Sequence, residues 1–219
     1  MDTETLGLRE SKKQETRQLI SDHATRLFIE RGFEATTIAE IAASARVAKK
    51  TVTNYFPHKE DMALDHQEEF VGGLARIVAA RAEGQSALEA LRESFLAAVR
   101  DQDPVAGFSG PQFSRMIAES PTLSARLRDL HDQRQDALAQ ALAVATGAAP
   151  GDITPRAAAA QFGGAHRLLF GRIQELTLAG QDNSAIAATI TEEAAQVFAL
   201  LEPSLAGYAT APRSTPTGP

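Results

Sequence analysis

The chain has 219 residues, 43% of them hydrophobic, which is enough for one or two domains with a sizeable apolar core. It contains no cysteine, which excludes disulfides and thiolate metal sites and is compatible with a reducing compartment. The N-terminus is acidic without an apolar run, and no stretch approaches the roughly 18 apolar residues of a spanning helix. We therefore expect a cytoplasmic protein with no signal peptide and no membrane partner.

The formal net charge of −6 is unevenly distributed along the chain. Residues 1–59 hold 10 Lys and Arg against 8 Asp and Glu, a net of +2, whereas residues 60–219 hold 12 against 20, a net of −8. All five lysines lie in the first 59 residues. A basic head on an acidic body would turn the head toward DNA, although a solvated charged face is the alternative.

The chain is predicted to begin with a disordered arm, residues 1–10, followed by a helix from about Ser11 to Arg31. Gly32 suits the left-handed residue that commonly ends a helix. Basic residues around the start of this helix would either reach phosphates or the minor groove, or form a solubilising tail; they are Arg9, Lys12, Lys13 and Arg17.

Two short helices joined by a tight turn are predicted within residues 37–56. Apolar residues recur at helical spacing in both, as Ile38, Ile41 and Ala42 and then as Val52, Tyr55 and Phe56. A small residue four positions before the turn residue Arg46, and an apolar residue six positions after it, are typical of a helix-turn-helix. Any two amphipathic helices with a short turn would show the same spacing, so the pattern alone leaves both interpretations open.

The outward face of the second helix carries groups suited to nucleic acid. Lysine ammonium groups bind phosphates, and an asparagine amide pairs with a base edge, preferably adenine. These groups belong to Lys49, Lys50, Thr51, Thr53 and Asn54.

The flanking segments, Arg31-Gly-Phe-Glu-Ala-Thr-Thr37 and Tyr55-Phe-Pro-His-Lys-Glu-Asp61, resemble the DNA-binding head of the tetracycline-repressor (TetR) family of bacterial regulators. The resemblance covers roughly residues 10 to 64. It implies an all-α protein with an N-terminal three-helix helix-turn-helix head and a helical-bundle body for ligand binding and dimerisation. Together with the residue chemistry, it assigns DNA contacts to Thr37, Arg46, Lys49, Lys50, Thr51, Thr53, Asn54, Tyr55 and Lys59, with Thr53 and Asn54 nearest the bases.

Two residues of the turn depart from that family pattern. Arg46 stands where glycine is usual, and a left-handed conformation there would cost about 1 kcal/mol. Ala48 stands where serine is frequent, and it cannot cap the second helix, a loss of about 1 kcal/mol. In return, Arg46 has the reach to contact a phosphate.

The remaining chain is predicted to be helical, without strands. A long helix is expected from about His58 to Ala82, with Gly72-Gly73 marking a bend or close packing. Further helices are expected over 86–100, 112–119, 121–146, 154–180 and 184–201, with starts marked by Ser-Pro, Thr-Pro and Asp-Asn-Ser. The predicted division is a helix-turn-helix domain at 11–57, an effector-binding and dimerisation domain at 58–202 and a disordered tail at 203–219.

The last two predicted helices are rich in small residues, which allow close helix approach. The family resemblance implies that they form a four-helix dimer interface with their copies, although burial in the body's own core is the alternative. A two-fold dimer suits a palindromic double-stranded operator, whose half-sites lie about 34–36 Å apart.

The resemblance also implies an effector pocket in the body, with candidate lining residues Phe95, Phe113, Met116, Ile117, His131, Arg134, Phe162, His166 and Phe170. Arg134 falls in line with leucines, where a permanent charge needs an anion from the protein or from a ligand. An ion pair or a hydrogen-bonded core histidine is the alternative for Arg134 and His166, respectively. A weak similarity to acyl-coenzyme A-binding members ranks an apolar, possibly anionic effector first.

Enzyme signatures are missing from the sequence. None of the five histidines follows an acidic residue by three positions, as a helical di-metal site requires, and no Gly-x-Ser-x-Gly or His-Glu-x-x-His motif occurs. We therefore expect no catalytic residues, metal or cofactor. The sequence predicts a homodimeric repressor released from DNA by a small-molecule effector, with a ligand-independent architectural DNA binder or an activator of the same family as the alternatives.

Overall fold

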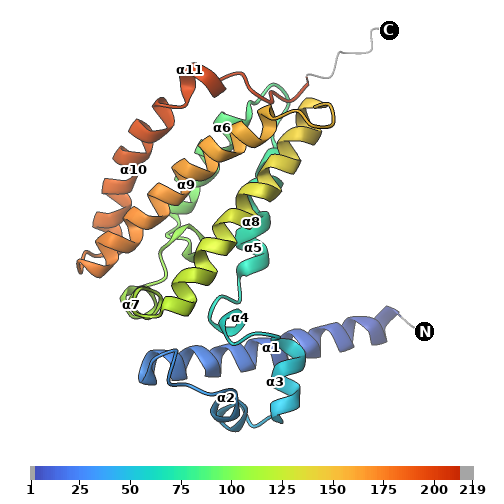
Figure 1. Cartoon of the computed structure of the whole chain (residues 1–219), viewed down its shortest axis with the longest axis vertical. Helices are drawn as coiled ribbons and strands as arrows, with labels where there is room; N and C mark the ends of the chain where they lie inside the picture. Colours follow the sequence, from blue (N-terminus) through green and yellow to red (C-terminus); the bar gives the residue numbers. More distant parts are fainter. Residues whose placement is uncertain (1–2, 213–219) are drawn as a thin grey trace. The chain divides into compact units, whose positions relative to one another are not determined.

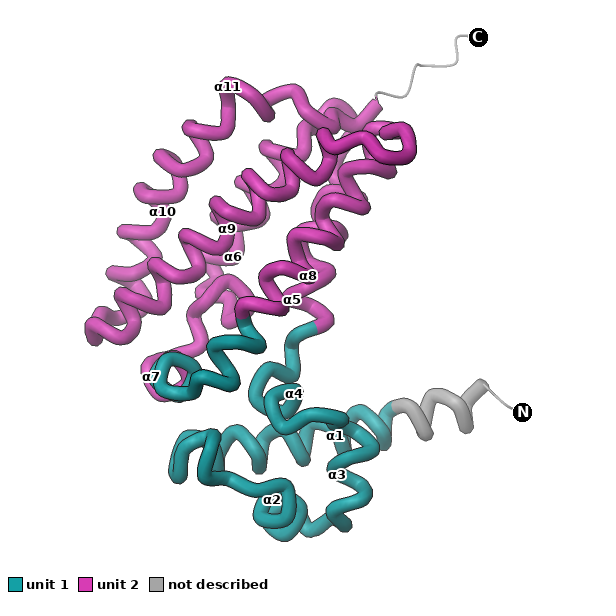
Figure 2. The backbone as a smooth tube through the Cα atoms, in the orientation of Figure 1, with its two compact units in different colours: residues 1–67, 115–127 teal, residues 68–114, 128–219 magenta. Residues whose placement is uncertain are grey.

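The computed structural model describes residues 3–212, with side chains from residue 11 onward, and this part of the chain contains helices and no strand. It forms two compact units (Figures 1 and 2). Unit 1 comprises the chain up to Gln67 together with residues 115–127, and unit 2 comprises residues 68–114 and the chain from residue 128 onward. The predicted division at residue 57 had placed all of residues 58–202 in the body.

Unit 1 contains α1 (Thr3–Arg31), α2 (Ile38–Ser44), α3 (Lys49–Tyr55) and α4 (Glu60–Ala63). Helix α1 packs against α2 and α4, and α2 packs against α3. Their shared core consists of fully or almost fully buried apolar side chains: Ile20, Phe28, Phe33, Ile41, Val52, Phe56 and Met62. The apolar faces predicted for the helix-turn-helix therefore lie inside, which leaves the polar faces of α2 and α3 for other contacts.

The long helix predicted from His58 to Ala82 is wrong, because the structure breaks it into α4 and α5 (Gln67–Ala80). Leu64 leaves the helical conformation, with φ −114° and ψ 51°. The carboxylate of Asp65 then accepts a hydrogen bond from the hydroxyl of Ser21 on α1. A contact with a distant helix thus accompanies a break that local helix propensity does not predict.

Unit 2 holds α5 apart from its first residue, α6 (Ala87–Arg100), the 3-10 turn η1 (Pro104–Ala106), α9 (Thr154–Leu178), α10 (Asn183–Ala199) and α11 (Glu202–Leu205). Helices α7 (Pro111–Glu119) and α8 (Pro121–Thr146) each contribute residues to both units. The helices of unit 2 share one apolar core that includes Leu74, Leu91, Leu138, Phe162 and Phe198. No helix in residues 3–212 is long and apolar enough to cross a membrane.

The structure corrects both predicted ends. Helix α1 begins at Thr3 instead of near Ser11, and only residues 1–2 of the predicted arm lie outside the described range. The predicted tail is ordered as far as residue 212, because Leu205 and Ala209 bury their side chains and Ala211 exchanges backbone hydrogen bonds with residues 84 and 85. The Pro- and Gly-rich composition of this segment predicts disorder, and the few apolar residues that make these contacts do not change that prediction. Residues 213–219 lie outside the described range.

Candidate nucleic-acid interface and ligand cavity

Helix α2 begins with a complete capping box. The Thr37 hydroxyl accepts a hydrogen bond from the backbone N–H of Glu40, and the Glu40 carboxylate accepts one from the Thr37 N–H. The Thr37 hydroxyl also donates to the Glu40 carboxylate at 2.7 Å. This bond is the main cause, followed by the bond from the Thr37 N–H, that holds the pKa of Glu40 below its usual value. The capping role expected of Thr37 is present, and its exposed position keeps it available as a predicted backbone contact.

The turn between α2 and α3 adopts the left-handed geometry that glycine usually provides. Arg46 has φ 55°, its N–H donates to the carbonyl of Ala43, and the N–H of Val47 donates to the carbonyl of Ala42. These two bonds form a Schellman motif, in which an arginine occupies the strained position. The Arg46 side chain is exposed, as a phosphate contact requires.

Helix α3 has one buried and one exposed face. Val52 and the following Phe56 are fully buried, whereas Lys49, Lys50, Thr53 and Asn54 are exposed and Thr51 and Tyr55 are half-buried. The Thr53 hydroxyl donates to the carbonyl of Lys50 and keeps its acceptor capacity. Ala48 makes no side-chain cap, as its chemistry dictates. The exposed face combines two ammonium groups with an amide, which is the chemistry of phosphate and base-edge contacts.

Arg17 on α1 fixes the C-terminal end of α3. Its Nη1 donates to the carbonyl of Tyr55 at 3.0 Å, and its guanidinium lies 4.3 Å from the ring centre of Phe56. A cation at a helix C-terminus is favourable because the last carbonyls carry partial negative charge. Arg17 therefore positions α3, which corrects the suggestion that it belongs to a DNA-contacting arm.

Lys59 also has a structural role. Its ammonium group donates to the carbonyls of Phe33 at 2.8 Å and Thr36 at 3.0 Å, and it lies 4.2 Å from the ring centre of Phe33. These partners occupy its donors and tie the loop after α1 to the start of α4. The phosphate contact predicted for Lys59 stays a prediction.

Unit 2 contains a cavity of about 240 Å³ between its helices. Its walls come from α5, α6, η1, α8 and α9, and they include Glu69, Gly73, Leu74, Arg76, Ile77, Ser94, Phe95, Ala98, Asp103, Val105, Ala106, Arg134, His166 and Phe170. The paired glycines of α5 make room beside this wall. A Cβ atom on Gly72 would lie 2.4 Å from Nη1 of Arg76, and one on Gly73 would lie 4.0 Å from Nη2 of Arg134.

Two polar side chains of the cavity wall have buried nitrogen atoms without a hydrogen-bond partner, Nε of Arg134 and Nε2 of His166. Burial and, to a smaller extent, the charge of Arg134 lower the pKa of His166 to about 3, so the imidazole is neutral at pH 7. Burial also lowers the pKa of Arg134 to about 10, which still leaves the guanidinium charged. Since buried polar groups are normally paired, these two side chains are exceptions within unit 2.

Both the helix-turn-helix region and the region that contains most of the cavity wall match known protein families. Residues 20–65 match the sequence model of "Bacterial regulatory proteins, tetR family", and residues 85–206, more than half of the chain, match that of the "MftR C-terminal domain". The chain belongs to the TetR family. It is therefore a DNA-binding transcriptional regulator with an all-helical fold, a helix-turn-helix N-terminal domain and a helical C-terminal domain.

Individual relatives are distant from this TetR-family chain. The HTH-type transcriptional regulator TcmR of Streptomyces glaucescens is 28% identical over 146 residues, which cover 64% of this chain and 65% of that relative's length. A TetR-family regulator from Streptomyces coelicolor A3 is 23% identical with a TM-score of 0.50, covering 85% of this chain and 96% of that one. SmeT in complex with triclosan is 18% identical with a TM-score of 0.54, covering 94% and 98% of the two chains. These two structures share the fold.

The cavity of this TetR-family regulator includes four of the predicted effector residues, Phe95, Arg134, His166 and Phe170. The other five are not among its lining residues. Phe162 is part of the solid core, Phe113 is half-buried on α7, and the His131 ring lies edge-on to Phe70 and Phe170. Met116 and Ile117 belong to unit 1.

Sequence reasoning missed Gly73 and Asp103 on the cavity wall. The Gly72-Gly73 pair was the available sign, because small residues within a helix often mark a close approach or a void. Among the described residues, no group of His, Asp or Glu is arranged to hold a metal ion.

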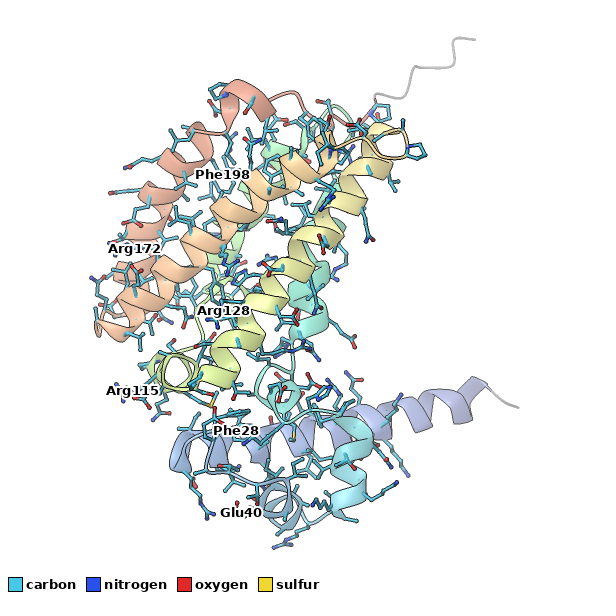
Figure 3. All side chains as sticks on the ribbon, viewed as in Figure 1. Phe28, Glu40, Arg115, Arg128, Arg172 and Phe198 are labelled. Atoms are coloured by element: carbon cyan, nitrogen blue, oxygen red, sulfur yellow. The ribbon has the colours of Figure 1, made fainter. Side chains whose placement is uncertain are left out.

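Helices α9 and α10 pack together (Figure 1), and small residues are exposed on both. Arg172 of α9 joins the two helices, because its Nε donates to both carboxylate oxygens of Glu193 at 3.2 Å (Figure 3). Leu168 on α9 is 61% exposed, and a Cβ atom added at Gly164 or Gly171 would meet nothing within 4 Å. Four alanines of α10 are exposed as well: Ala185, Ala188, Ala195 and Ala199.

Proposed function

We propose that this TetR-family regulator is a homodimeric repressor that occupies a palindromic operator and leaves it when a small-molecule effector fills the cavity of unit 2. Residues 11–57 act as the DNA-binding domain, and residues 58–202 bind the effector and form the dimer. The observation that carries the proposal is the exposed face of α3, where Lys49, Lys50, Thr53 and Asn54 lie opposite a fully buried face.

Each group of that face has a defined task in the proposal. Lys49 and Lys50, together with Arg46, bind phosphates and provide affinity, while Thr53 and Asn54 reach base edges in the major groove. Thr37, Thr51 and Tyr55 support backbone contacts at the ends of the two helices. Arg17 fixes the C-terminal end of α3, and Lys59 ties the loop after α1 to the start of α4, each through a hydrogen bond to a backbone carbonyl.

Release by an effector follows from differential affinity. An effector that binds the DNA-incompetent conformation more tightly than the competent one shifts the population toward the former. A ligand-independent architectural protein would show no such shift, and the unpaired Arg134 and His166 in the cavity wall favour the ligand-dependent function. An activator would use the same contacts and differ in the direction of its effect on transcription.

The DNA part is tested by selecting bound fragments from the source genome with the unaltered chain and with Asn54→Ala. We expect the unaltered chain to select a palindrome. We expect Asn54→Ala to lose about 1–3 kcal/mol of discrimination between the correct and the wrong base pair, at one position in each half of the palindrome. Unchanged sequence preference in the variant would remove Asn54 from the readout. Failure of the unaltered chain to bind any duplex at low salt would refute the proposal as a whole.

The dimer is tested at the outer face of α9. In the proposed dimer, the outer face of α9 contacts the same face of the second subunit. Leu168→Glu would bury a charge in this contact, so we expect the variant to be monomeric in sedimentation equilibrium. Leu19→Glu is the matched control, because Leu19 is an exposed leucine, 44% accessible, on α1. A dimer that survives Leu168→Glu would place the interface elsewhere.

A further inference from the structure

The Arg134 guanidinium lies in the cavity wall without a full counter-charge. It forms no ion pair within 4.0 Å with another described residue, and its Nε, which is inaccessible to solvent, has no partner. The Phe70 ring, whose centre is 4.5 Å from the guanidinium carbon, offers only a cation–π contact. Arg134 is half-buried, and a guanidinium in a cavity wall without a bonded anion binds an incoming carboxylate through charge-assisted hydrogen bonds, so an anion from outside the chain would complete the site.

The carboxylates of the wall do not supply that anion. Asp103 attracts Arg134 electrostatically, but it caps η1 by accepting the N–H of Val105 at 2.8 Å. The second guanidinium of the wall, Arg76, donates to the backbone carbonyl of Glu69 at 3.0 Å. Arg134 is therefore the cation of this wall that faces the cavity without a bonded oxygen among the described residues.

His166 on α9 lies in the same wall. It is only 5% exposed, and its ring lies edge-on between Phe95 and Phe198, with centres 5.4 and 5.7 Å away. Its Nε2 is inaccessible to solvent, so His166 contributes a flat, uncharged surface to the wall and no hydrogen bond to a ligand.

The size and the walls limit the rest of the ligand. A volume of about 240 Å³ is below the range of about 300–1,000 Å³ that is usual for drug-sized ligands. Phe95 and Phe170 present aromatic rings on the wall, and Leu74 and Ile77 present aliphatic groups. This favours a body of one or two rings and disfavours complete enclosure of a coenzyme A thioester.

We propose that the effector is a compact aromatic acid whose ionised acid group is bound by the guanidinium of Arg134. The inference deepens the proposed function and rests on the cavity of unit 2 being its effector site. It adds the chemical class of the ligand and the residue that selects it.

The test is isothermal titration calorimetry on the full chain near neutral pH with a defined panel. The acids are benzoate, trans-cinnamate, 1-naphthoate, 2-naphthoate and indole-3-acetate, each compared with its primary amide, and 1-naphthylmethylamine is the cationic probe. We expect at least one acid to bind about tenfold or more tightly than its amide, because a charge-assisted bond to guanidinium is lost in the amide. Arg134→Met should lose the same factor and bind acid and amide alike.

Three variants separate a ligand contact from a structural role. Arg134→Met should keep or raise the melting temperature of the ligand-free protein, since it removes an unpaired buried charge. Arg167→Met is the matched control, because Arg167 pairs with the exposed Asp132 across the same two helices; it should bind the acid normally. Gly73→Leu should abolish binding by filling the cavity without changing any charge.

Several results would overturn the inference: no acid of the panel binding better than its amide, tighter binding of the amine, or unchanged acid affinity in Arg134→Met. Parallel measurements of DNA affinity distinguish this failure from that of the proposed function. If the acid binds through Arg134 but leaves DNA affinity unchanged, the ligand class stands and effector release fails. If the acid releases Arg134→Met from DNA as well as the unaltered chain, release stands and the Arg134 site fails.

Discussion

The proposed binding sites of the two units place their polar groups in opposite ways. In unit 1, the charges of Lys49 and Lys50 lie outside, over an interior in which the buried Ser21, Thr36 and Asp61 are each hydrogen-bonded. At the cavity of unit 2, nitrogen atoms without partners lie inside, on Arg134 and His166. A surface that binds a large external partner needs a satisfied interior and free groups outside, whereas a site for an enclosed small molecule needs the reverse.

This difference has a consequence for stability. A satisfied interior keeps each polar group near the free energy it has in water, while each unpaired buried group costs about 1–3 kcal/mol. Unit 2 therefore gives up stability in its ligand-free form and recovers it on binding. The following predictions test the contrast at a buried histidine of unit 2, at a half-buried cation of unit 1 and at the exposed turn.

The largest effect is expected from acid. The pKa of His166 is about 3 in the folded chain because of burial, against about 6.5 in the unfolded chain, so the unfolded state binds the extra proton between these values. The contribution of His166 to stability is complete above pH 6.5 and falls by about 1.4 kcal/mol per pH unit below it, or about 3 kcal/mol by pH 4. His131, whose pKa burial lowers to about 4, acts in the same direction.

Urea unfolding as a function of pH measures this effect. The His166→Phe variant should show a shallower loss of unfolding free energy between pH 6.5 and pH 4, and the exposed His58→Gln should follow the unaltered chain. Equal slopes in all three proteins would show that His166 is protonated in the folded state and has a partner there.

The next effect concerns Lys59. Replacing it with methionine keeps the contact with the Phe33 ring but removes its hydrogen bonds to two backbone carbonyls, at a cost of about 2–3 kcal/mol of unfolding free energy. DNA binding should weaken because the head is less stable, while the dependence of affinity on salt should keep its slope. Urea unfolding and DNA titrations at several salt concentrations measure the two quantities.

Lys50→Ala is the matched variant for this experiment. Because Lys50 is exposed, its removal should leave stability unchanged and lower the salt slope by at most about one unit. A reduced slope in Lys59→Met would restore Lys59 as a phosphate contact and contradict the role derived from its carbonyl partners.

The smallest effect is expected at the turn. Arg46→Gly relieves a left-handed conformation at φ 55° and should raise the free energy of unfolding by about 1 kcal/mol. The same change should weaken DNA binding modestly, since it removes an exposed cation. A lower urea midpoint for the variant would mean that the arginine side chain stabilises the turn by more than its strain.

Unit 1 was largely predictable because its determinants are local. The capping residues Thr37 and Glu40 and the turn residue Arg46 act over three or four positions, and sequence spacing reveals such distances. The break at Leu64 was not predictable, because the bond between Ser21 and Asp65 joins residues 44 positions apart. The structural role of Lys59 was not predictable for the same reason, since its carbonyl partners lie 23 to 26 residues earlier.

The cavity was only partly predictable. Periodicity identifies residues that face inward, such as Phe162 and His166, but not which of them border a void and which are packed solid. Arg134 stood out because a charge among leucines violates the pattern. The paired glycines were a sign for Gly73, but Asp103 follows no such rule, since its role depends on what the neighbouring helices leave empty.

The closing segment of unit 2 sets an order for folding during synthesis. Arg81 donates to the carbonyl of Ala209, and Gly84 and Gln85 exchange backbone hydrogen bonds with Ala211, so residues more than 120 positions apart meet at one end of this unit. A nascent chain cannot make these bonds until residues 209–211 have left the ribosome. Unit 2 therefore completes its structure only after about 130 further residues have followed Arg81, whereas α1, α2 and α3, all within the first 55 residues, are free to pair much earlier.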